Sequence, residues 1–106
     1  EYPHAIRIME QALTAAREGG LLGESVLGSL HRFELALRVG GGAYICGEET
    51  ALLESLEGKR GVVRAKPPLP AVSGLFGMPT VINNVLTLAA VSDVLAKGAA
   101  HYAALG

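Results

Sequence analysis

The sequence predicts an α/β fold with parallel strands, in the order helix, strand, helix, strand, helix. Apolar residues recur at helical spacing in residues 3–20, 48–57 and 85–98. Residues 33–39 instead alternate apolar and polar side chains, and residues 80–85, "TVINNV", have the composition of a short buried strand. Because strands that alternate with helices usually pair in parallel, we expect a partial Rossmann-like layer.

The expected elements are separated by residues that end helices and strands. Pro3 is tolerated in the first turn of a helix, and Gly19 and Gly20 favour its end. Residues 21–30 fit either a short helix or a turn. Prolines and glycines disfavour regular structure in residues 58–79, which we therefore expect to form a long loop.

Composition excludes several classes of protein. The chain has 106 residues, enough for one small domain or a piece of a larger one, and its net charge of −1 argues against nucleic-acid binding. Cys46 is the sole cysteine, so neither an internal disulfide nor a four-cysteine iron–sulfur cluster can form within the chain. The absence of disulfides, and of an apolar run of roughly 18 residues, favours a cytoplasmic protein without direct membrane insertion. The histidines lack metal-ligand spacing, so we expect no bound metal.

A glycine-rich stretch, "GGGAYICGEE" at residues 40–49, follows the first expected strand and leads into a helix. Gly42 and Gly47 match the spacing of a phosphate-binding loop, G-x-x-x-x-G. Such a loop then needs Lys and Ser or Thr, whereas this chain has Glu48 and Glu49, whose carboxylates would repel phosphates. A dinucleotide-binding G-x-G-x-x-G loop is excluded as well, because its third position lacks the glycine or alanine that close packing needs.

Paired carboxylates at a helix N-terminus have two interpretations. They can stabilise the helix, by about 0.3–1 kcal/mol each, or they can accept hydrogen bonds from the hydroxyls of a sugar. A carboxylate that accepts the ribose 2′-OH of NAD also repels the 2′-phosphate of NADP. Tyr44, beside them, is either an ordinary core tyrosine or a flat ring suited to a planar ligand.

A second polar stretch, Asn83 and Asn84, lies near the end of the second expected strand. In open α/β sheets, ligands bind outside the carboxyl ends of the strands, so this pair and residues 40–49 could line one crevice. Either stretch alone is more simply explained as a turn or a helix cap. Two such stretches in equivalent positions favour a binding site.

Three motifs at their spacing, "YICGEET", "KPP" and "NNV", resemble the FMN- and NADH-binding flavoprotein subunit of the NADH:quinone oxidoreductase family. That family includes the diaphorase subunits of NAD-linked hydrogenases and the beta subunits of NAD-dependent formate dehydrogenases. The resemblance implies that residues 1–106 are the C-terminal portion of an FMN/NADH-binding domain. We therefore expect a fragment, with the family's upstream glycine-rich loop and downstream Fe–S region outside this chain.

By this resemblance, the parent protein would transfer hydride between NADH and FMN and pass electrons on to Fe–S clusters. Its cofactors would be FMN and NAD(H), and its partners the Fe–S electron-transfer subunits of a multi-subunit complex. Membership of a respiratory complex would place it at the membrane periphery. The flavin would supply the chemistry, so no catalytic residue is assigned, and we expect the isolated chain to be inactive.

The resemblance also assigns positions in the cofactor site. Glu49 would lie near the NADH ribose and favour NADH over NADPH, and Lys66 would lie near the dinucleotide. The amides of Asn83 and Asn84 would donate and accept hydrogen bonds at the FMN. The full set of expected cofactor-binding residues is Gly42, Tyr44, Gly47, Glu48, Glu49, Lys66, Asn83 and Asn84.

Two departures from the family pattern bear on the branch. Leu69 stands where many relatives have an aromatic residue, and Leu86 where respiratory members commonly have glutamate; both favour the hydrogenase or formate dehydrogenase branch. Two other functions are compatible with the sequence: a nucleotide-binding module without redox activity, and an interaction module whose exposed apolar helix faces self-associate. The basic side chains of Lys59, Arg60 and Arg64 fit either contact with phosphates or, at least as well, a solvated loop.

Overall fold

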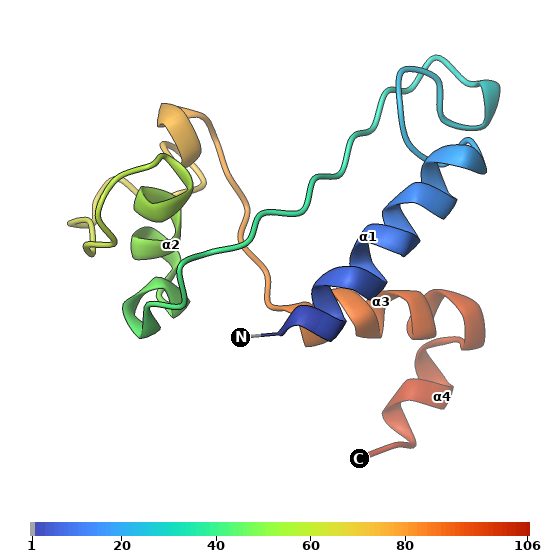
Figure 1. The fold of residues 1–106 in the computed structure, drawn as a ribbon. Coiled ribbons are helices and arrows are strands. Elements are labelled where there is room, and N and C mark those ends of the chain that lie inside the picture. The colour runs from blue at the N-terminus through green and yellow to red at the C-terminus, as the bar shows by residue number, and fades with distance from the viewer. Residues whose placement is uncertain (1) are drawn as a thin grey trace. The chain divides into compact units, whose positions relative to one another are not determined.

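Residues 2–106 are described by a computed structural model, in which helices are connected by long stretches without regular structure (Figure 1). The chain divides into two compact units, Glu1–Tyr44 and Ile45–Gly106. The helices are α1, Pro3–Glu18, in the first unit, and α2, Glu49–Leu56, α3, Val85–Lys97, and α4, Ala99–Ala103, in the second. Short 3-10 turns lie at Val26–Gly28, Tyr44–Gly47 and Leu75–Gly77. No helix in the described part of the chain is long and apolar enough to cross a membrane.

In the first unit, α1 confirms the first helix expected from apolar spacing. Pro3 occupies its first turn, and the backbone leaves the helix at Gly19. The ambiguous stretch after α1 forms a turn rather than an α-helix. An antiparallel bridge closes this turn, because Gly23 and Phe33 exchange both backbone N–H···O hydrogen bonds, at 2.7 and 3.0 Å.

Neither expected strand forms among the described residues, and the prediction of a parallel-strand layer is not met there. Residues 34–43 lie in Figure 1 as a long uncoiled segment, and no backbone hydrogen bond links them to another described segment. Residues 80–84 likewise join no sheet. The alternating pattern indicates a face suited to burial, but a strand also needs the N–H and C=O groups of a neighbour. Without one, the side chains of Leu35 and Val39 stay exposed.

The second unit contains α2 and the loop that follows it. α2 confirms the helix expected over residues 48–57, and the loop expected over residues 58–79 is interrupted by one short 3-10 turn, Leu75–Gly77. Figure 1 shows this loop wrapped around α2. Buried residues come from both segments, and the loop is therefore packed onto the helix: they are Thr50, Ala51, Leu53, Pro70 and Gly74.

The second unit also contains α3 and α4, which pack against each other. α3 confirms the last expected helix, whereas α4, after Gly98, was not expected. Asn84 is the N-cap of α3, because its Oδ1 accepts a hydrogen bond from the backbone N–H of Thr87 at 2.7 Å. An apolar groove of about 420 Å³ lies between the two helices.

Candidate functional site

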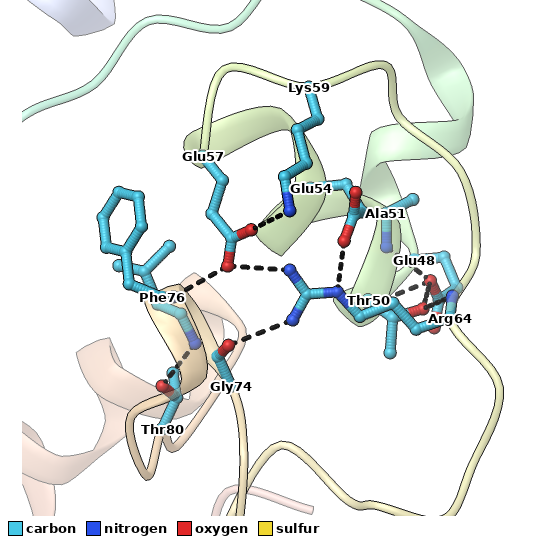
Figure 2. Close-up of polar contacts among 11 residues, drawn as sticks. Glu48, Thr50, Ala51, Glu54, Glu57, Lys59, Arg64, Gly74, Phe76 and Thr80 are labelled. Atoms are coloured by element: carbon cyan, nitrogen blue, oxygen red, sulfur yellow. Dashed lines mark hydrogen bonds and ion pairs between the residues drawn. The ribbon is translucent and has the colours of Figure 1, made fainter.

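The site begins with Glu48, which is the N-cap of α2. Its Oε2 accepts three hydrogen bonds, from the Thr50 N–H at 2.9 Å, the Thr50 hydroxyl at 2.5 Å and the Ala51 N–H at 2.8 Å (Figure 2). The Thr50 hydroxyl is the largest cause that lowers the pKa of Glu48, followed by the Ala51 N–H. The helix-stabilising interpretation of this carboxylate is therefore confirmed. Its Oε1 makes no hydrogen bond to a described residue.

Glu49 is the first residue of α2 and has a different partner. Its Oε1 accepts a hydrogen bond from the ammonium of Lys66, which raises the pKa of that lysine. The two side chains are 40% and 38% exposed. An ion pair this exposed is screened by water and contributes little to stability, so a polar ligand can replace either partner at little cost.

Thr50 connects these carboxylates to the loop. Its side chain is buried, and its hydroxyl oxygen donates to Glu48 while accepting the backbone N–H of Arg64 at 3.0 Å. The hydroxyl thus uses its donor and one acceptor site at once. One buried side chain therefore links the N-terminus of α2 to the loop segment that carries Lys66.

Arg64 lies against α2 and is not the solvated loop residue that the sequence suggested. Its guanidinium bonds Glu54 Oε1 at 2.5 Å, Glu57 Oε1 at 2.8 Å and the Gly74 carbonyl oxygen at 3.0 Å (Figure 2). Its side chain is 24% exposed. Glu57 and then Glu54 are the main causes that raise the pKa of Arg64.

Glu57 is the least exposed carboxylate of this network, at 6% of its side chain. Besides Arg64, it pairs with the ammonium of Lys59 at 3.0 Å and accepts the backbone N–H of Phe76 at 2.7 Å. These bonds, with that of Arg64 first, lower the pKa of Glu57 from the usual 4.5 to about 2. Sequence reasoning missed this network. Its available signal was two glutamates, Glu54 and Glu57, three residues apart at the end of the expected helix and before an arginine-containing loop.

The structure brings some of the expected cofactor residues together. Glu48, Glu49 and Lys66 meet at the start of α2, and Gly47 directly precedes them. Asn83 and Asn84 precede α3, while Gly42 and Tyr44 belong to the first unit. The side chain of Tyr44 is fully exposed, so the core interpretation of this tyrosine is wrong for the described chain. The cofactor contacts of all eight residues stay predictions.

The architecture recurs within larger redox proteins. The chain is similar to a solved NAD+-reducing [NiFe]-hydrogenase in the H2-reduced state, with a TM-score of 0.70 and 46% identity. A second structure of an NAD+-reducing [NiFe]-hydrogenase, in the air-oxidized state, gives a TM-score of 0.68 and 47% identity. The matches cover 89% of this chain and 16% and 15% of those chains.

Residues 1–93 match the model of the Nuo51 FMN-binding domain, and the chain belongs to this family. The mitochondrial NADH dehydrogenase [ubiquinone] flavoprotein 1 of Dictyostelium discoideum is 46% identical over 106 residues. The NADP-reducing hydrogenase subunit HndC of Solidesulfovibrio fructosivorans is 48% identical over the same length. All of this chain is matched, but it spans only 22% of each of these relatives. The family resemblance seen in the motifs is confirmed.

The lowered pKa of Glu57 predicts a pH dependence of stability. A carboxylate whose pKa is lower in the folded state stabilises the fold above its unfolded pKa, and this contribution is lost as the pH falls through the folded pKa. We expect the free energy of unfolding, measured with urea, to fall between pH 4.5 and about 2. Glu57→Gln should flatten this part of the profile. Glu10→Gln, on an exposed part of α1, is the control and should keep the wild-type profile; equal slopes in all three proteins would contradict the network.

Proposed function

We propose that this chain is part of an oxidoreductase subunit that transfers hydride between NADH and FMN and passes electrons to Fe–S clusters of partner subunits. The observation that carries the proposal is the cluster of Glu48, Glu49 and Lys66 at the start of α2, in a chain of the FMN-binding family. Relatives named as a mitochondrial NADH dehydrogenase flavoprotein and a hydrogenase subunit support a multi-subunit complex. The proposed setting is cytoplasmic, at the membrane periphery if the complex is respiratory.

Each residue of the cluster has a distinct proposed role. Glu48 is the N-cap of the helix. Its Oε1 accepts no hydrogen bond from a described residue, so it can accept a hydrogen bond from a hydroxyl of the ligand. Glu49 accepts ribose hydroxyls and repels a 2′-phosphate, which favours NADH over NADPH. Lys66, released from Glu49, supplies the compensating positive charge near the dinucleotide. The flavin, when bound, supplies the redox chemistry.

The N-terminus of α2 fits a sugar or a ring edge better than the FMN phosphate. The backbone N–H groups of Thr50 and Ala51, which a phosphate would use there, already donate to Glu48. The family's upstream glycine-rich loop is therefore the proposed phosphate site. The exposed amide of Asn83 and the NH2 group of Asn84 are the proposed flavin contacts.

We further propose that residues 1–106 are the C-terminal portion of an FMN/NADH-binding domain whose parallel-strand layer is completed by neighbouring segments of the parent protein. The unpaired backbone of residues 34–43 and the exposed side chains of Phe33, Leu35 and Val39 support this, because both features suit a strand within a sheet. The chain's share of its relatives, 22%, leaves room for such segments.

The runner-up function is an interaction module without redox activity. The observation that favours it is the exposure of large apolar side chains on α3: Val85, Leu86 and Leu95 are each about four-fifths exposed. Apolar surface of this kind promotes association. A mass that rises with concentration in light scattering, from a protein that binds no flavin, would support this alternative.

The first test of the proposed function concerns nucleotide choice in the intact FMN-loaded protein. Glu49→Gln removes the charge that repels a 2′-phosphate and weakens ribose binding. We expect the KM for NADH to rise about tenfold while that for NADPH stays the same or falls. The reason is that Gln replaces a charge-assisted hydrogen bond, of roughly 1.5–3 kcal/mol, by a neutral one of roughly 0.5–1.5 kcal/mol. Steady-state oxidation of each nucleotide, with an excess of a soluble electron acceptor that reoxidises the FMN, measures this. Glu10→Gln should leave both KM values unchanged, and an unchanged NADH/NADPH ratio in Glu49→Gln would contradict the proposal.

The second test separates the capping role of Asn84 from flavin binding. Asn84→Ser keeps an N-cap acceptor but removes the NH2 group, whereas Asn84→Ala removes both. We expect both variants to weaken FMN binding, measured by quenching of flavin fluorescence, and only Asn84→Ala to lose about 1 kcal/mol of stability as well. If Asn84→Ser binds FMN as tightly as the wild type, Asn84 is a cap alone.

A further inference from the structure

Arg64 contacts both ends of α2. Its backbone N–H bonds the hydroxyl of Thr50, in the first turn, and its guanidinium bonds Glu57, the residue that follows the last turn. Glu54 and the carbonyl of Gly74 complete its partners. The contacts of this single loop residue therefore extend from the first turn of α2 to the residue after its last turn, as Figure 2 shows.

This placement determines where Lys66 can lie. Two residues of fully extended chain span at most about 7 Å, so holding the backbone of Arg64 confines that of Lys66. The partner of Lys66, Glu49, is in turn adjacent to Thr50, which accepts the Arg64 N–H. Arg64 and Lys66 of the loop therefore contact two adjacent residues of the helix, Thr50 and Glu49.

The Lys66–Glu49 pair cannot set this geometry by itself. It is exposed, and solvent-screened pairs of this kind contribute little to stability. The contacts of Arg64 are less exposed and involve several charge-assisted hydrogen bonds, which are roughly twice as strong as neutral ones. The network around Arg64 therefore determines the position of the Lys66–Glu49 pair, whereas that pair does not determine the position of Arg64.

We propose that Arg64 is a positioning residue of the dinucleotide site, which holds Lys66 at the start of α2 where Glu48 and Glu49 lie. The inference rests on the proposed function, because it assigns Lys66 to NADH. An arginine is required because its planar fork reaches three acceptors in fixed directions, whereas a lysine is a point charge on a flexible stem.

The test is a double-mutant cycle in the intact FMN-loaded protein, with steady-state oxidation of NADH by an excess of a soluble electron acceptor, which reoxidises the FMN, as the readout. Arg64→Lys keeps the charge but cannot bridge Glu54, Glu57 and Gly74. We expect it to raise the KM for NADH about tenfold with kcat nearly unchanged, as for a loss of uniform binding. Lys66→Met should raise the KM by at least as much. In the Lys66→Met background, Arg64→Lys should add less than about twofold, because the group that Arg64 positions is already absent.

A milder variant and a matched control complete the design. Glu54→Gln removes the charge of one partner of Arg64 but keeps an acceptor oxygen, and it leaves Glu57 and Gly74. It should therefore give a smaller KM increase, which is also lost in the Lys66→Met background. Arg60→Lys changes a neighbouring exposed arginine in the same loop and should leave KM unchanged. FMN content and Tm, measured for each variant, show that the protein is folded and loaded.

Other results would overturn the inference. If Arg64→Lys multiplies the KM equally in the wild-type and Lys66→Met backgrounds, Arg64 acts independently of Lys66. If Arg64→Lys lowers Tm without changing KM, its role is structural only. If Lys66→Met leaves the KM unchanged, both the inference and the role of Lys66 in NADH binding are wrong. Failure of the wild-type protein to reduce FMN with NADH would instead refute the proposed function itself.

Discussion

The packing of the loop on α2 depends on one requirement, the neutralisation by Arg64 of Glu54, on α2, and of Glu57, the residue that follows it. Glu57 is nearly buried, and a carboxylate in that position is costly unless it is paired and hydrogen-bonded. The arginine that pairs with it comes from the loop, so the loop must pack on the helix for the charges to be satisfied. The small apolar core, in which Leu53 is the largest buried side chain, could not hold a loop of this length alone.

The docked loop gives the two neighbouring carboxylates different roles. Glu48 turns back onto α2 and caps it, which satisfies backbone N–H groups that would otherwise attract an anion. Glu49 faces the exposed ammonium of Lys66 and remains open to solvent. The N-terminus of α2 is thus neutralised by its own N-cap carboxylate, and a separate exposed ion pair lies beside it. This arrangement suits recognition of sugar hydroxyls better than recognition of a phosphate. The glycine-rich stretch before α2 therefore differs in chemistry from the triphosphate-binding loop that its spacing suggests.

Local features of the structure were predictable from the sequence, and features that depend on a distant partner were not. The helices α1, α2 and α3 follow from apolar spacing and flanking residues, which act within a few positions. The short helix α4 was missed, because five residues after Gly98 carry little periodic signal. The expected strand at residues 33–39 has the correct alternation, but its existence depends on a neighbour that the described residues do not provide. At the candidate site, the motifs singled out Glu49 and Lys66 as expected cofactor residues but did not predict that the two side chains pair. Arg64 was missed because ion pairing across a loop leaves no fixed spacing.

Residue-by-residue amide hydrogen exchange tests the central claim, that charge pairing at Arg64 holds the loop on α2. The informative amides are those of Arg64 and Phe76, which donate to Thr50 and Glu57, compared with the Glu57 amide, which donates to Leu53 at the end of α2. We expect the two loop amides to be protected to the same degree as the helix amide, and Arg64→Lys to lower the protection of the loop. Exchange of both loop amides at the rate of an unstructured chain, while α2 stays protected, would contradict it.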